Sequence, residues 1–390
     1  MDASEELGLE TLLQHFAEGD QPHRAVVPPI YQTSLFGFDE LAGFEHALRE
    51  NPAGPPFHYS RISNPNLHIV EQKLARLERT DRSKLFSTGM GAIYAAIMHC
   101  SKNGGHVVAV HTCYGPVRTM LADYLSRFGV TCEFVDGRSP ESILDAIGPE
   151  TTAVYLESPS SLVFRMQDIE AVAKVCREKG VATIADNTYS TPLFQNPASM
   201  GVDIVVHSGT KYLGGHSDLT AGVVCLSAER YERFVREEVA FIGSTLGPFQ
   251  AWLMLRGMRT LSVRLKHHEA SANRLASWLQ KRPEVESVHH VSLPDYPQRD
   301  LYLKQMRGSA GLFSFVPKDQ SNGWVTRFVE ALELFELGVS WGGFESLVVA
   351  VPMKHFSSSL TGWVVRLFCG LEDPEDLERD LAQALAKACG

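Results

Sequence analysis

The sequence lacks most features that mark secreted or metal-binding proteins. Its 390 residues include 7 cysteines, an odd number, and none of them form a C-x-x-C pair. Scattered cysteines of this kind are typical of reduced thiols in the cytoplasm, and they argue against a disulfide framework or a cysteine zinc site. The 15 histidines show no ligand spacing that recurs with a third donor, so we expect no metal.

Long apolar runs and clusters of positive charge are also missing. No apolar segment reaches the roughly 18 to 20 residues that span a bilayer, and the acidic first residues contain no apolar stretch typical of a secretory signal. The net charge is −10, without any run rich in lysine or arginine. We therefore expect a cytoplasmic protein that binds neither membranes nor nucleic acid.

What is present is enough apolar sequence for more than one hydrophobic core, since 44% of the residues are hydrophobic. Residues 1–60 are rich in proline, glycine and aromatics, which favours an extended arm lying on another surface. Residues 61–255 alternate strand-like runs with helical patterns and predict a large α/β domain with a mostly parallel sheet. Residues 256–390 start with a long helical pattern (256–281) and predict a smaller C-terminal α/β domain.

Two polar clusters follow two short apolar runs of the predicted large domain. Asp186 follows the run 181–185, and the Ser-Gly-Thr-Lys sequence at 208–211 follows the run 202–207. Such runs predict buried parallel strands, whose carboxyl ends face the ligand. An acid for a pyridinium nitrogen, a lysine for a Schiff base and hydroxyls for a phosphate are what pyridoxal 5′-phosphate (PLP) requires. We predict a PLP site with Lys211 as the covalent and catalytic lysine, Asp186 at the ring nitrogen, and Ser208 and Thr210 at the phosphate.

Each of these residues also has an ordinary alternative role. A lone aspartate at a strand end is usually a cap or turn residue, and a lone lysine is usually a solvated charge. The Gly-Thr-Lys sequence at 209–211 also looks similar to a P-loop. The Walker pattern, however, places Gly-Lys-Ser/Thr after a glycine-rich loop, and no upstream glycine has the required spacing here.

A glycine-rich turn and a tyrosine complete the predicted cofactor site. The sequence 87–91 opens a helical segment at 92–98, and such a turn offers N–H groups and a positive dipole end to an anion. We therefore expect Gly89 and Met90 at the cofactor phosphate. Tyr114 follows a predicted strand at 107–110, where it either stacks on the cofactor ring and assists catalysis or is an ordinary turn aromatic.

These motifs, in this order, resemble those of the Cys/Met-metabolism family of PLP enzymes, which includes cystathionine β- and γ-lyases, cystathionine γ-synthase and methionine γ-lyase. The resemblance covers nearly the whole chain and implies the aspartate-aminotransferase-like fold, fold type I. The matching segments are 28–31, 59–61, 64–65, 87–90, 157–159, 186–188, 208–218, 256–261 and 370–377.

The resemblance implies further site residues that spacing alone does not identify. Tyr59 and Arg61 match a pair that reaches the cofactor phosphate of the neighbouring subunit, with Tyr59 also near the substrate. This implies a homo-oligomer, expected to be a tetramer of two active dimers. Arg366 matches the arginine that binds the substrate carboxylate, a task suited to a guanidinium. Ser340 and the adjacent Trp341 match further substrate contacts, and the expected partner is a small-molecule substrate of the amino-acid class.

Three features resemble bacterial cystathionine β-lyase most closely: Trp341, the Ser-Ser-Leu sequence at 160–162, and Pro116. The expected reaction is therefore β-elimination of L-cystathionine to homocysteine, pyruvate and ammonia, in methionine biosynthesis. Val117 argues against methionine γ-lyase. The sequence 59–65 and the glycines at 214–215 are closer to the γ-branch, so γ-elimination, γ-replacement, or a specialised lyase acting on another amino acid with a leaving group stay open.

Overall fold

Two β-sheets with packed helices form the fold, and the computed structural model describes residues 7–49, 53–355 and 362–390. The larger sheet is built from residues 82–226 and the smaller from residues 285–368. The predicted α/β class is confirmed. The division of the chain at residues 60 and 255 into an arm and two domains stays a prediction. No helix in the described part of the chain is both long and apolar enough to cross a membrane.

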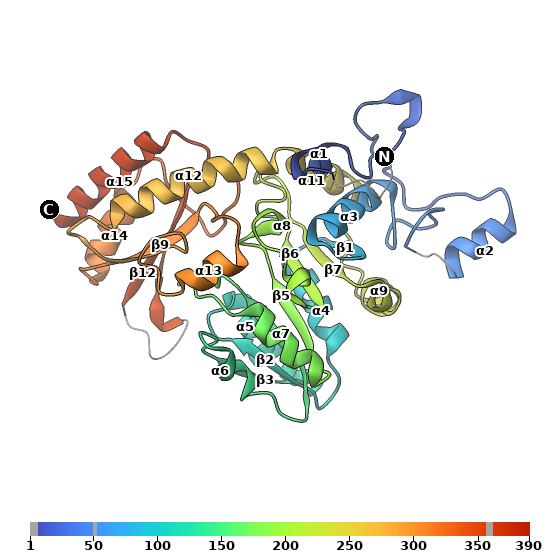
Figure 1. Cartoon of the computed structure of the whole chain (residues 1–390). Helices are drawn as coiled ribbons and strands as arrows, with labels where there is room; N and C mark the ends of the chain where they lie inside the picture. The colour runs from blue at the N-terminus through green and yellow to red at the C-terminus, as the bar shows by residue number, and fades with distance from the viewer. Residues whose placement is uncertain (1–6, 50–52, 356–361) are drawn as a thin grey trace.

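The larger sheet has seven strands in the order β1-β7-β6-β5-β4-β2-β3. Its strands are β1 (Arg82–Phe86), β2 (His106–Val110), β3 (Thr131–Val135), β4 (Thr151–Glu157), β5 (Ala182–Asp186), β6 (Ile204–Ser208) and β7 (Gly222–Leu226). Strands β3, β2, β4, β5 and β6 pair in parallel, whereas β7 is antiparallel to both β6 and β1. The mostly parallel sheet expected from the buried apolar runs is confirmed (Figure 1).

Two helices of the larger sheet begin after a residue whose side chain caps the first turn, and the first of them begins three residues before the predicted segment 92–98. In α4 (Gly89–Cys100), the Thr88 side chain caps the first turn by accepting from the N–H of Gly91, and the helix packs on β6 and β7. In α7 (Ile169–Glu178), which packs on β5, the Asp168 carboxylate accepts from the N–H of Ala171. Other helices along the chain are α3 (Pro65–Glu78), α5 (Gly115–Thr119), α6 (Pro140–Leu144), α8 (Thr191–Phe194), α9 (Ala228–Phe234), α10 (Ala240–Ile242) and α13 (Arg299–Gln305).

The smaller sheet has the order β10-β11-β12-β9-β8. Its strands are β8 (Val285–His289), β9 (Leu312–Pro317), β10 (Glu336–Leu337), β11 (Leu347–Pro352) and β12 (Trp363–Phe368). The helix α12 (Leu261–Leu279) packs on β8 and β9, α14 (Asn322–Ala331) on β11, and α15 (Pro374–Cys389) on α12 and α14. Figure 1 shows this unit beside the larger sheet, with α15 at its outer edge.

The single long helix predicted over 256–281 is wrong in its bounds. The chain instead forms α11 (Pro248–Arg259), which starts earlier, and then α12. The break lies at Thr260, whose ψ of 3° leaves the helical range and whose hydroxyl donates to the carbonyl of Gly257. A threonine hydroxyl that bonds the preceding turn competes with the helical backbone bonds.

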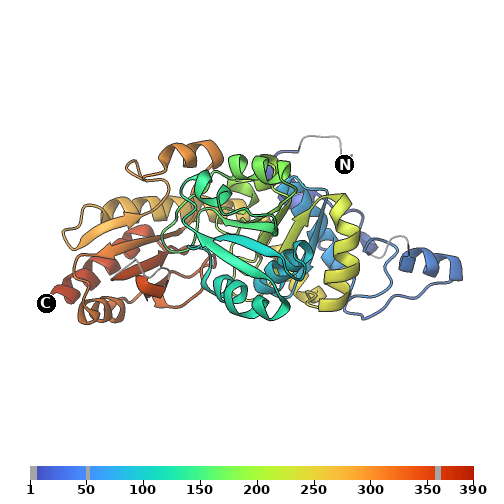
Figure 2. The ribbon, with the colours of Figure 1, turned by 90° about the horizontal axis from the view of Figure 1, so that it is seen from below.

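The N-terminal arm reaches away from the larger sheet, with α2 (Leu41–Arg49) at the end of the molecule opposite the C-terminus (Figures 1 and 2). The same segment contains α1 (Leu9–His15), which packs on α3 and α11. The Trp252 indole N–H donates to the Pro28 carbonyl, which connects the N-terminal segment to α11. Residues 1–6 and 50–52 of the predicted arm lie outside the described residues.

Candidate active site

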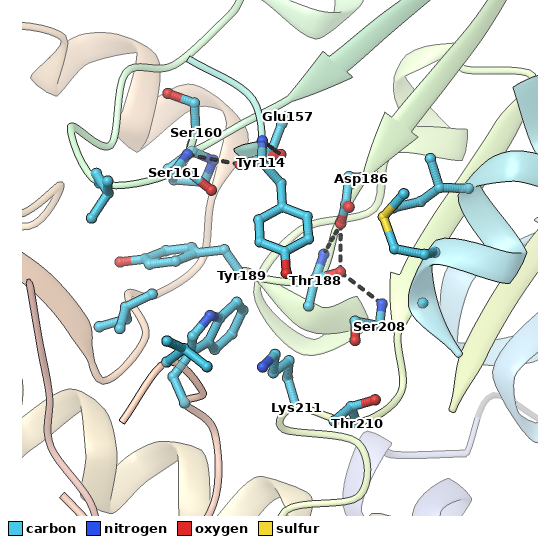
Figure 3. A pocket seen from close by; sticks show the side chains of 18 of the residues that line it. Tyr114, Glu157, Ser160, Ser161, Asp186, Thr188, Tyr189, Ser208, Thr210 and Lys211 are labelled. Atoms are coloured by element: carbon cyan, nitrogen blue, oxygen red, sulfur yellow. Dashed lines mark hydrogen bonds between the residues drawn. The ribbon is translucent and has the colours of Figure 1, made fainter. Parts of the chain in front are cut away.

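A cavity of about 250 Å³ lies at the carboxyl ends of β4, β5 and β6. The strand register pairs Glu157 with Asp186, so these parallel strands end at the same edge. Residues from the smaller sheet complete the wall of the cavity. The predicted site residues that line it are Gly89, Met90, Tyr114, Asp186, Ser208, Thr210, Lys211, Trp341 and Arg366. Figure 3 shows several of them directed toward one another.

Lys211 lies between the two sheets, on the turn that follows β6. Its Nζ donates to Ser340 Oγ at 2.8 Å and lies 5.4 Å from the centre of the Trp341 ring. Burial lowers the pKa of Lys211 to about 8, and the positive charge of Arg366 acts in the same direction, whereas Glu345 opposes them. A lysine of lowered basicity has more of its amine neutral near pH 7, which suits attack on an aldehyde carbon.

This lowered pKa predicts a pH dependence for the binding of PLP to the cofactor-free protein. Only the neutral amine attacks the aldehyde, so the rate of covalent incorporation should rise with pH, with a midpoint near the Lys211 pKa of about 8. Substituting Arg366→Met removes a neighbouring positive charge and should move the midpoint upward. Stopped-flow absorbance of the cofactor measures both curves; a midpoint that Arg366→Met leaves in place would contradict the electrostatic cause.

Asp186 ends β5 with its carboxylate held by neighbours. Its Oδ1 accepts from the N–H of Thr188 at 2.9 Å and from the Thr188 hydroxyl, and its Oδ2 accepts from the Tyr155 hydroxyl at 3.2 Å. Burial raises the pKa of Asp186, although the two bonds from Thr188 and the nearby His207 lower it. A cationic N–H donor would stabilise this carboxylate, which is what a protonated pyridine nitrogen offers.

The opposite side of the cavity is formed by the N-terminus of α4 and the turn after β6. A Cβ at Gly89 would lie 2.8 Å from Ser208 Oγ, so the helix backbone approaches this turn closely. The N–H of Ser208 donates to Thr188 Oγ1 at 2.8 Å, which joins the turn to the β5 end. The Thr210 hydroxyl donates to the Ala221 carbonyl at 3.2 Å, so it anchors this turn; its predicted phosphate contact stays a prediction.

Tyr114 and Arg366 face the cavity from opposite sheets. The Tyr114 side chain is 48% exposed, and its ring points toward the cavity centre near Asp186 (Figure 3). Arg366 lies on β12, where its Nη2 donates to the carbonyls of Val339 and Ser340 at 3.0 and 3.2 Å. Burial lowers the pKa of Arg366 to about 10, so the guanidinium is still charged near pH 7 and can bind a carboxylate.

Three predicted residues are not among those that line this cavity: Ser340, whose Oγ nevertheless accepts from Lys211 Nζ, and the pair Tyr59 and Arg61. Tyr59 is 41% exposed, and the Arg61 guanidinium lies 5.5 Å from the Tyr59 ring. Nη1 of Arg61 donates to the Ala240 carbonyl. Neither side chain lines the Lys211 cavity of its own chain.

The structure adds residues that the sequence prediction did not place in the site. Glu157 and Tyr189 line the cavity, and Tyr155 binds Asp186. Glu157 had a usable signal, because it follows the apolar run 152–156 just as Asp186 follows its own run. The two tyrosines carried no such signal, since aromatic residues beside strands are usually part of the core.

These side chains fit PLP. A buried carboxylate with raised pKa suits the ring nitrogen, a lysine of lowered basicity suits the aldehyde, and a helix N-terminus suits the phosphate. The fold and the site together define a PLP-dependent enzyme of fold type I.

The chain belongs to the Cys/Met metabolism PLP-dependent enzyme family, whose model matches residues 10–386. It is 38% identical to an L-methionine gamma-lyase of Treponema denticola, over 98% of both chains. It is 34% identical to a cystathionine gamma-lyase of Bacillus subtilis, over 96% of this chain and 98% of the relative. It is 33% identical to a chloroplastic cystathionine beta-lyase of Arabidopsis thaliana, over 98% of this chain and 81% of the relative.

The predicted family, fold class and cofactor are therefore confirmed. The protein is a PLP-dependent enzyme of the carbon–sulfur lyase type, acting in sulfur amino-acid metabolism. The relatives carry three different reaction names, so family membership does not choose between β- and γ-elimination.

Proposed function

We propose that this enzyme catalyses β-elimination of L-cystathionine, releasing homocysteine, pyruvate and ammonia. The observation that carries the proposal is the position of the residues that resemble bacterial cystathionine β-lyase. Trp341 and the sequence 160–162 both line the Lys211 cavity, where they can affect the choice of substrate. Trp341 lies directly beside the amine of Lys211.

The side chains of the cavity suit each step of this elimination. Arg366 binds the substrate carboxylate, and Lys211 removes the proton from Cα. Bound PLP supplies the electron sink that stabilises the charge left at Cα. Lys211, assisted by the Tyr114 hydroxyl, then protonates the sulfur that leaves Cβ. The Lys211 Nζ lies 2.8 Å from Ser340 Oγ and 5.4 Å from the centre of the Trp341 ring, so both residues border the group that transfers the proton.

A second candidate is γ-elimination from an uncharged thioether such as L-methionine. Relatives named L-methionine gamma-lyase are 38% and 37% identical to this chain. The cavity wall also includes the apolar side chains of Leu162, Phe164, Leu312 and Val339, which suit an uncharged leaving group.

We also propose that Tyr59 and Arg61 act on the cofactor of a neighbouring subunit in a homo-oligomer, expected to be a tetramer. Neither residue lines the Lys211 cavity of the same chain, and both are exposed, which supports this role. A guanidinium on an exposed side chain is suited to bind a phosphate that another subunit brings close.

Turnover of L-cystathionine and L-methionine by the purified holoenzyme tests the proposed reaction. We expect L-cystathionine to give pyruvate and homocysteine, separated and quantified by chromatography, with a kcat/KM at least about tenfold above that for L-methionine, a difference of roughly 1.4 kcal/mol. Formation of 2-oxobutanoate as the main keto acid from L-cystathionine, or a higher kcat/KM for L-methionine than for L-cystathionine, would contradict the proposed β-elimination and support the γ-branch, with the same residues around the cofactor.

A further inference from the structure

Glu157, at the carboxyl end of β4, joins two loops of the active site through one buried carboxylate. Its side chain is 7% exposed. Oε2 accepts from the backbone N–H of Tyr114, and Oε1 accepts from the backbone N–H of Ser161, both at 2.7 Å (Figure 3). These N–H groups belong to the loops after β2 and β4, so the carboxylate fixes the spacing between the loops.

A second contact joins the same two loops. The Thr112 hydroxyl donates to Ser160 Oγ at 2.7 Å, and both residues are fully buried. With this contact, the loop that presents Tyr114 is attached to the β4 loop at two points. Rotation of the Tyr114 backbone would break at least one buried hydrogen bond, which is costly because a buried polar group loses its partner.

The two contacts suit a carboxyl group better than an amide. Both oxygens accept from N–H donors, so a glutamine would direct its NH₂ group at one of them. Burial and the neighbouring Asp186 raise the pKa of Glu157, whereas the two N–H donors lower it. Burying a second acidic side chain beside Asp186 costs free energy. The two hydrogen bonds accepted from Tyr114 and Ser161 offset this cost, so they, and not packing alone, account for a glutamate at this position.

We propose that Glu157 is a positioning residue that holds the Tyr114 hydroxyl in the place needed to assist protonation of the leaving sulfur, and that it does so through the Tyr114 backbone. The inference rests on the proposed role of Tyr114 and is independent of the choice between β- and γ-elimination. Glu157 itself touches no reacting atom in this proposal. Its effect on turnover should therefore depend on whether Tyr114 has its hydroxyl.

A double-mutant cycle of Glu157→Gln and Tyr114→Phe tests this dependence. We expect each single substitution to lower kcat roughly 10- to 100-fold, with KM changed less than about threefold. We expect the double variant to lose no more than the worse single variant, because Glu157 acts through the group already removed. Losses that multiply in the double variant would overturn the inference.

One further measurement separates a positioning role from a structural one. The circular dichroism band of the bound cofactor should weaken in Glu157→Gln and stay unchanged in Glu133→Gln, a matched control on the exposed surface of β3. If both variants change alike, the positioning role is wrong. If Tyr114→Phe alone has wild-type kcat, the proposed role of Tyr114 fails, and this inference fails with it.

Should Glu157→Gln fold poorly, Thr112→Val provides the same test. It removes the hydroxyl bond to Ser160 and leaves the carboxylate in place. We expect a smaller loss of kcat, roughly two- to tenfold, which is again absent when Tyr114 is already phenylalanine. A loss of equal size in both backgrounds would overturn the proposal.

Discussion

Replacing Lys211 with alanine is expected to lower kcat by at least roughly 10⁴-fold, because one side chain supplies both the covalent attachment of the cofactor and the proton transfers. The change should leave the fold intact. Within the described residues, the Lys211 amine makes a hydrogen bond to Ser340 and a cation–π contact with the Trp341 ring, and neither contact holds the two sheets together alone. Steady-state kinetics measures the loss, and the absorbance of the protein should lack the band of covalently bound cofactor.

Lys211→Arg is the matched control for charge. It keeps a cation and its donors in the cavity, but a guanidinium stays protonated and cannot attack the aldehyde. We expect it to be as inactive as Lys211→Ala. Appreciable turnover by either variant would remove Lys211 from its catalytic role.

Mixing subunits extends this test to the proposed oligomer. Lys211→Ala and Arg61→Ala should each be inactive or weak alone, whereas a mixed dimer contains one site with both Lys211 and Arg61 intact. If half of the randomly assorted dimers are mixed, roughly a quarter of the sites regain activity. No recovery after confirmed subunit exchange would show that Arg61 does not act across the interface.

The sequence predicted those parts of the site that follow directly from strand ends. Asp186, Ser208 and Lys211 each follow an apolar run, and parallel strands bring such ends to one edge. Arg366 and Trp341 depended on the family resemblance, because a strand arginine and a loop tryptophan have no periodic signal. Both residues line the cavity only because the smaller sheet packs against the larger one, and local sequence patterns do not predict that packing.

Other features depended on side-chain geometry that a pattern cannot supply. The Thr210 hydroxyl bonds Ala221, 11 residues later, so its direction follows from a turn and not from its place beside Lys211. The break at Thr260 depends on a hydroxyl bond to Gly257 inside an otherwise helical pattern. The pairing of Glu157 with Asp186 follows from the register of β4 and β5, which the sequence alone does not fix.

Replacing Asp186 with asparagine should lower kcat by roughly 10²- to 10³-fold, the size expected when a preorganised electrostatic partner is lost. Asparagine keeps the shape of the side chain, and its oxygen can still accept from Thr188. What disappears is the negative charge that would keep the pyridine nitrogen protonated. Steady-state kinetics measures the effect, and the affinity for PLP, measured by equilibrium titration, should fall as well.

The stability of the cofactor-free protein should change in the opposite direction. Because burial raises the pKa of Asp186 above its ordinary value of 3.8, ionisation near pH 7 destabilises the folded state, and this penalty is absent when pH falls below that value. Asparagine has no such penalty, so the Tm of cofactor-free Asp186→Asn near pH 7 should equal or exceed that of the wild type.

The advantage should shrink as the pH is lowered toward 3.8, where aspartate becomes neutral in both folded and unfolded chains. Thermal denaturation of both proteins over this pH range measures it. If the variant has a lower kcat but an equal or higher Tm without cofactor, Asp186 serves cofactor function and lowers the stability of the cofactor-free protein. A clearly lower Tm across the whole range would instead assign Asp186 a structural role, and the loss of turnover would no longer report on the ring nitrogen.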